Sequence, residues 1–121
     1  MRNRALSIFL IFLSVLTLTT VVSAANITKI GTGHDPAIYG NNVTWSDTAG
    51  SIHIYDLTAK KDTKINSPNG SHPAIYGNKL VWHDESNGTP RIAIYDIPSR
   101  SRIFVTKDVD NQSFPRIYGT R

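Results

Sequence analysis

The fold of this chain is decided by a stretch that occurs twice, PAIYGNNVTWSD at residues 36–47 and PAIYGNKLVWHD at residues 73–84. Eight of the twelve aligned positions are identical. A third start, PRIYG, occupies residues 115–119, and the stretch IHIYDL at 52–57 matches IAIYDI at 92–97. Self-similarity at a period of roughly 40 residues indicates an architecture built from small, similar units.

The local signals within one repeat are those of short strands and tight turns. In the second repeat we expect four strands separated by glycine, asparagine, serine and proline: 73–76, 80–84, 91–97 and 102–106. No window shows the 3.6-residue apolar period of an amphipathic helix. The sequence therefore predicts an all-β chain.

The expected strands carry apolar residues on both faces. Leu80 and Trp82 point to the side opposite Val81, so the sheet needs cover on both sides. Four short antiparallel strands per repeat, with each small sheet lying between neighbours, describe the blade of a β-propeller. The alternatives are a β-sandwich, whose strands would be polar on one face, and a β-solenoid, whose repeats are shorter.

These motifs resemble the repeat of β-propeller cell-surface proteins of methanogenic archaea and, more distantly, TolB-like propeller repeats. The resemblance rests on PAIYGN, the Trp-x-Asp that follows it and the later Ile-x-Ile-Tyr-Asp, and it covers residues 27–121. It implies a place in the archaeal envelope and a role in adhesion, envelope structure or ligand binding. It implies no particular chemistry, because propellers host both binding proteins and enzymes.

The register of the resemblance divides a partial propeller at 26–121 into four parts. These are an outer strand at 27–30, a blade at 36–66, a blade at 73–106 and the start of the next blade at 114–119. Closed propellers use about 4–8 blades. We therefore expect an incomplete propeller, about two blades with partial flanking strands, as in a truncated product. Its open apolar blade faces favour self-association.

Residues 1–24 have the three-part layout of a secretory signal peptide. Two arginines precede an uncharged run at 5–22, and cleavage is expected after Ala24 or Ala25. The alternative is a retained anchor, because a run of this length is near the lower limit for a spanning helix. We expect an exported protein at the cell surface or outside the cell, which touches the membrane only if this segment is kept.

The composition excludes several classes of function. The chain has no cysteine, which excludes a disulfide scaffold, thiol chemistry and cysteine-ligated zinc. Beyond residues 1–24, the 11 basic and 9 acidic side chains are scattered along the sequence. No basic stripe supports nucleic-acid binding.

Aromatic residues that recur in the repeat are the candidates for ligand stacking: Trp45, Trp82, Tyr39 and Tyr76. The tryptophans could stack on sugar rings, but their alternation with aliphatic residues favours a place in the core between blades. The tyrosines lie on the expected innermost strand. There they could line a central channel or pack between blades.

Four aspartates recur once per repeat: Asp47, Asp56, Asp84 and Asp96. Regular recurrence favours structure, with carboxylates accepting N–H bonds in turns. The turns lack the alternating acidic ligands of a calcium loop, and the four histidines lack metal-ligand spacing. No nucleophile elbow, phosphate loop or dinucleotide fingerprint occurs. We predict no metal, no cofactor and no enzymatic activity.

Five Asn-x-Ser/Thr sequons are present, and Asn26, Asn69 and Asn111 are the candidates for glycosylation of an exported protein. The expected function is a structural or adhesive surface protein whose partners are envelope proteins or glycans. One alternative is an oligomeric two-blade lectin. The other is the propeller portion of a larger hydrolase.

Overall fold

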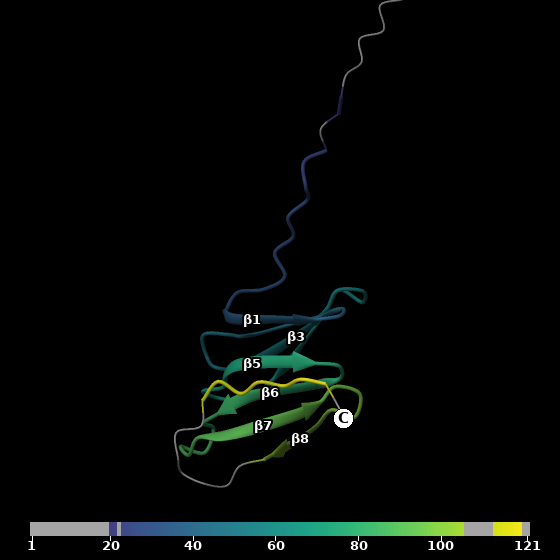
Figure 1. Ribbon diagram of the computed structural model, residues 1–121. Helices are drawn as coiled ribbons and strands as arrows, with labels where there is room; N and C mark the ends of the chain where they lie inside the picture. The colour runs from purple at the N-terminus through teal and green to yellow at the C-terminus, as the bar shows by residue number, and fades with distance from the viewer. Residues whose placement is uncertain (1–19, 22, 106–112, 120–121) are drawn as a thin grey trace, which may run out of the picture.

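The computed structural model describes residues 20, 21, 23–105 and 113–119. Eight strands follow one another in this part of the chain: β1 (His34–Tyr39), β2 (Asn42–Ser46), β3 (Ile52–Asp56), β4 (Lys61–Ile65), β5 (Ser71–Tyr76), β6 (Lys79–Asp84), β7 (Arg91–Asp96) and β8 (Ser101–Phe104). They form two antiparallel meanders, an N-terminal sheet of order β1-β2-β3-β4 and a C-terminal sheet of order β5-β6-β7-β8 (Figure 1). The predicted all-β class and the four strands in each repeat are confirmed.

Equivalent hairpin turns in the two sheets have the same backbone conformation. Gly40 and Gly77 connect the first two strands of each sheet with φ of 54° and 58°. Lys60 and Arg100 connect the last two strands with φ of 53° and 56°. Left-handed backbone is unfavourable for a residue with a Cβ atom, so its recurrence at non-glycine positions indicates that the hairpin geometry is fixed by the fold.

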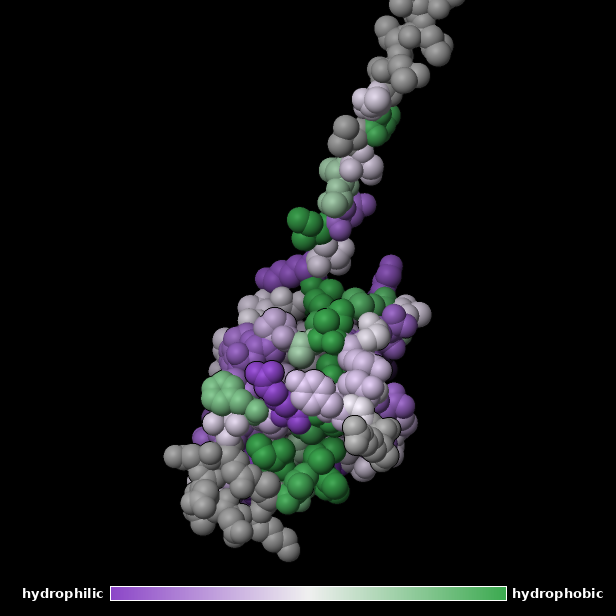
Figure 2. Space-filling view, viewed as in Figure 1, coloured by the Kyte–Doolittle hydropathy of each residue, from purple (hydrophilic) through white to green (hydrophobic). Residues whose placement is uncertain are grey.

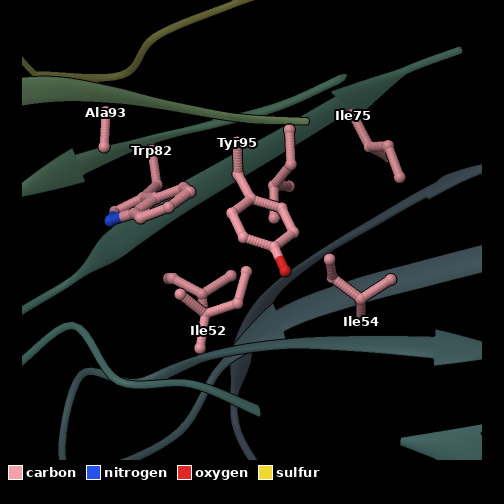
Figure 3. Packing of buried hydrophobic residues seen from close by; sticks show 8 residues of the cluster. Ile52, Ile54, Ile75, Trp82, Ala93 and Tyr95 are labelled. Atoms are coloured by element: carbon pink, nitrogen blue, oxygen red, sulfur yellow. The ribbon is translucent and has the colours of Figure 1, made fainter. Parts of the chain in front are cut away.

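An apolar core lies between the two sheets (Figure 3). Trp82 and Tyr95 of the C-terminal sheet point toward Ile52 and Ile54 of β3. The fully buried members of the cluster are Trp82, Ile52, Leu80 and Ala93. Full burial of one large apolar side chain stabilises a fold by about 1.5–3 kcal/mol, so this cluster contributes substantially to holding the two repeats together.

The backbones of the two sheets approach each other at their first strands. Within 8 Å between Cα atoms, β5 lies against β1 and β2. The rings of Tyr39 and Tyr76, at the ends of β1 and β5, lie 4.7 Å apart between centroids with planes tilted by 46°. Farther out, the large side chains of Trp82 and Tyr95 fill the space between β3 and the C-terminal sheet.

The two segments expected to flank the blades are not strands in the structure. Residues 27–30, expected as an outer strand, have no ladder partner, and neither do residues 114–119, expected to begin a further blade. Phe114 nevertheless has a φ of 60°, and Asp35 and His72, which also precede a repeated proline, each have a φ of 52°. The third repeat therefore begins with the same backbone as the first two.

Most of the expected signal peptide lies outside the described residues, as does Asn111. Residues 20, 21 and 23–33 belong to no helix or strand. Where the structure describes the chain, no helix is both long and apolar enough to cross a membrane.

Candidate functional site

Trp82 is a core residue and presents no ring face to a ligand. It is completely buried, and its indole Nε1 donates hydrogen bonds to Ser67 Oγ at 2.9 Å and to Asp84 Oδ2 at 3.3 Å. Ser67 also donates to the buried Asp84 carboxylate. The position between the sheets is the one that the alternation of the strand favoured.

Trp45 occupies the equivalent position in the N-terminal sheet but lies on its outer face, the face turned away from the C-terminal sheet. Its ring stacks on the His53 ring, with centroids 5.0 Å apart and an interplanar angle of 6°. The segment before β1 covers it so closely that a Cβ atom at Gly31 would lie 2.3 Å from the indole. Only 6% of Trp45 is exposed, so it too offers no open ring to a sugar.

The tyrosines of the first strands are more accessible. Tyr39 is 39% exposed and Tyr76 is partly buried beside it. A Cβ atom at Gly119 would lie 3.2 Å from the Tyr76 hydroxyl, which places the third repeat beside this pair. Tyr39 and Tyr76 therefore remain candidates for contact with a ligand.

The recurring aspartates hold turns, as predicted. Each accepts backbone N–H bonds from the residues just after it: Asp47 from Ala49 and Ser51, Asp56 from Thr58 and Ala59, Asp84 from Ser86, and Asp96 from Ser99. Hydrogen bonds from Lys79 and Ser99 lower the pKa of Asp96 to about 2. Burial acts to raise the pKa of Asp84, but hydrogen bonds from Ser67, Ser86 and Trp82 outweigh it and lower the pKa.

A hollow of about 330 Å³ lies where the three repeats begin. Its walls come from equivalent pairs of residues, each a proline and the left-handed residue before it, together with Ala74 and Arg116: Asp35 and Pro36, His72 and Pro73, Phe114 and Pro115. Left-handed backbone before each proline sets the direction of the first strand and brings the three pairs together. The hollow is therefore a product of the repeat itself.

The chemistry of this hollow is mixed. Phe114 is 63% exposed and its ring lies 4.1 Å from the His72 ring, between centroids. The hydrogen bond with His34, at 3.0 Å, lowers the pKa of Asp35, and His72 Nε2 lies 3.8 Å from the Asp35 carboxylate. An open aromatic face beside a carboxylate and the Arg116 guanidinium offers stacking, hydrogen bonding and charge to one ligand.

This hollow was not predicted from the sequence, because the residues before the prolines differ: Asp35, His72 and Phe114. The available signal was their common position, one residue before the proline that opens each repeat. A residue before proline is biased toward extended backbone, so the left-handed turn itself was not expected.

A second polar cluster was also missed, on the outer face of the N-terminal sheet. His53 Nδ1 lies 2.7 Å from Asp62 Oδ2, and its Nε2 lies 3.2 Å from Asp47 Oδ2. Lys64 Nζ donates to the same Asp47 oxygen at 3.0 Å. Burial opposes ionisation of Asp47, but hydrogen bonds from Lys64 and His53 and from backbone N–H groups hold its pKa far below its usual range.

Among the sequons, Asn69 is exposed in the loop between the sheets, with a φ of 61°, and Asn26 is exposed before β1. Both side chains are open to a modifying enzyme. In the part of the chain that the structure describes, no group of three or more His, Cys, Asp or Glu side chains could hold a metal ion.

Comparison with known proteins adds no family. No protein-family model matches this chain, and no curated protein matches it.

Proposed function

We propose that this chain is part of a β-propeller that serves as a structural or adhesive module at the cell surface and binds glycans or envelope proteins without catalysis. The repeat resembles those of methanogenic surface propellers and TolB-like proteins. Support comes from two equivalent four-stranded meanders that stack through Trp82, with their first strands closest together. In a propeller, the innermost strands of neighbouring blades lie closest together, around the central channel. The first strand of each sheet would have this place.

The observation that carries the binding role is the hollow built from the three proline pairs. It lies at the first strands, which border the central channel of a propeller. Phe114 supplies an exposed ring on which a sugar could stack, and Asp35 and Arg116 supply acceptor and donor groups for hydroxyls. A surface glycan is the ligand class that this combination fits best.

Binding is tested with the chain from residue 25 onward on a glycan array, followed by NMR titration of each hit. We expect backbone shifts confined to residues around the hollow, and at least a tenfold loss of affinity in Phe114→Ala and Asp35→Asn. Leu57→Ala is the matched control, because Leu57 is 41% exposed outside the hollow. Glycan binding that survives both hollow variants would place the ligand elsewhere and overturn this assignment.

Export is tested separately by expressing the whole chain in an archaeal or eukaryotic secretory host. We expect the secreted protein to begin at Ala25 or Asn26 and to carry glycan mass that Asn69→Gln removes in part. A chain that stays in the cytosol with its first residues intact would contradict the surface location.

A further inference from the structure

A second pocket lies between the two sheets, and it shares no lining residue with the hollow at the prolines. Its volume is about 160 Å³. Strand register places it at the other end of the strands, because its lining residues Asn42 and Asp56 pair with each other just after the first hairpin. The hollow, in contrast, lies where β1 and β5 begin. The two are separate sites.

The Tyr95 hydroxyl is a polar group of this pocket that has no partner. Only 7% of Tyr95 is exposed, and Figure 3 shows its hydroxyl directed toward Ile54, which also lines the pocket. In the part of the chain that the structure describes, no group forms a hydrogen bond with this hydroxyl. Polar groups of buried residues rarely lack a partner, because the hydrogen bond with water that they lose must be replaced. A ligand in the pocket would supply that partner.

The pocket also holds charges that are free to bind a ligand. Lys61 and Arg100 both line it and are exposed, and neither forms an ion pair with any described residue. The Asp56 carboxylate lines it as well and uses only Oδ1 to accept the N–H bonds of Thr58 and Ala59. Two cations and a free carboxylate oxygen, Oδ2, therefore face one small space.

The polar lining departs from the repeat. Strand register shows that Lys61 and Thr63 stand where the second repeat has Ser101 and Ile103. The aspartate of that second face, Asp96, already binds a lysine of β6. Hydrophobic residues gather over β7 and β8, where the equivalent face is uncovered (Figure 2). The fold therefore does not require polar groups at these positions, and their presence indicates a role confined to this pocket.

We propose that the pocket between the sheets binds a uronic acid, a sugar that carries a carboxylate. Arg100 and Lys61 donate to the sugar carboxylate, and guanidinium groups match the planar geometry of a carboxylate with two parallel hydrogen bonds. The Tyr95 hydroxyl donates to the same end of the sugar, and Asp56 Oδ2 accepts from its hydroxyl groups. The buried side chain of Ile54 contacts the apolar face of the ring.

The size of the pocket agrees with a single sugar. Sites for drug-sized ligands measure about 300–1,000 Å³, so a pocket about half the lower figure accepts one ring and not a longer chain. The choice of a sugar acid among small hydroxy acids rests on the proposed surface role. The anion site itself does not depend on that role or on the hollow.

The test is an NMR titration of the chain with sodium glucuronate, with glucose as the neutral probe and free glycine as a zwitterionic probe. We expect glucuronate to bind with a Kd on the order of 1 mM, as its number of non-hydrogen atoms allows. Backbone shifts should be confined to the residues around the pocket. Glucose should bind at least tenfold more weakly, because it offers nothing to the two cations.

Three variants and one matched control locate the site. Arg100→Ala, Lys61→Ala and Tyr95→Phe should each weaken glucuronate binding about tenfold, because each removes a donor to a charged group. The first two change exposed side chains, and Tyr95→Phe keeps the packed ring, so all three should fold. Lys60→Ala is the control, because Lys60 has the hairpin position of Arg100, with φ of 53° against 56°, but lies outside the pocket. It should bind as the unchanged chain does.

Unchanged binding in Arg100→Ala and Tyr95→Phe, or equal affinity for glucose, would overturn the proposal. Tighter binding of glycine than of glucuronate would overturn the sugar class. Phe114→Ala should leave glucuronate binding intact, since Phe114 lines only the hollow, and a parallel loss would place the sugar acid there instead. Because the two sites are changed by different variants, failure at this pocket is distinct from failure of the proposed glycan site at the hollow.

Discussion

Replacement of Trp82 by alanine should destabilise the whole molecule, because this side chain joins the two sheets. Trp82 is completely buried, packs with Ile52 and Ile54, and donates two hydrogen bonds from its indole nitrogen. Removal of a buried tryptophan costs about 3–5 kcal/mol in unfolding free energy. The total stability of a small domain is about 5–15 kcal/mol, so this loss is a large share of it.

The assay is urea unfolding followed by far-ultraviolet circular dichroism, with Trp45→Ala as the matched control. Both tryptophans occupy the same strand position and are buried, but Trp45 lies outside the cluster between the sheets, under the segment at 31–33. We expect Trp82→Ala to lower the unfolding free energy by about 3–5 kcal/mol, and Trp45→Ala, which removes no contact between the sheets, to lower it by less. Equal losses, or a larger loss at Trp45, would refute the assignment of Trp82 as the link between sheets.

Three further predictions concern turns and charges. The pKa of Asp84 is lowered in the folded state, so its contribution to stability is present above a pH of about 4 and is lost as pH falls below the unfolded pKa. The unfolding free energy, measured by urea titration, should therefore fall as pH is lowered below about 4, and this fall should be smaller in Asp84→Asn. Gly50 has a φ of 80°, and a Cβ atom there would lie 2.4 Å from Asn69 N, whereas Gly40 has a φ of 54° and open space around it. Thermal melts should show a loss of about 1–2 kcal/mol in unfolding free energy for Gly40→Ala and a clearly larger loss for Gly50→Ala. Equal losses would contradict the close approach of Gly50 to Asn69. The Arg91 guanidinium lies 3.6 Å from the Phe104 ring centroid, measured from Cζ, and 3.4 Å from Asp84 Oδ1, measured from Nη2. Arg91→Ala should lower the unfolding free energy, measured in urea, by about 1–3 kcal/mol. An unchanged unfolding free energy would show that both contacts are dispensable.

The repeat was sufficient to predict the strands, because the alternation of Leu80 and Trp82 and the turn at Gly77 are local properties. The turn role of Asp47 and Asp84 was likewise predictable from recurrence and position. Residues 27–30, expected as an outer strand, form no strand in this structure, because neither of the two described sheets pairs with them.

The hollow and the His53 cluster could not be predicted from local pattern. The hollow depends on left-handed backbone at Asp35, His72 and Phe114, against the usual preference before proline. The cluster depends on cross-strand register, which brings His53 opposite both Trp45 and Lys64. Its signal was the one position where the two IxIYD stretches differ in chemistry, histidine in the first and alanine in the second.

The central claim is that two equivalent sheets stack through Trp82. A nuclear Overhauser experiment on the chain with labelled isoleucine methyl groups tests it most directly. We predict strong cross-peaks from the Trp82 indole protons to the methyl groups of Ile52 and Ile54, and none from the Trp45 indole to these methyl groups. Absence of the Trp82 cross-peaks, or rapid exchange of its indole N–H with water, would contradict the account.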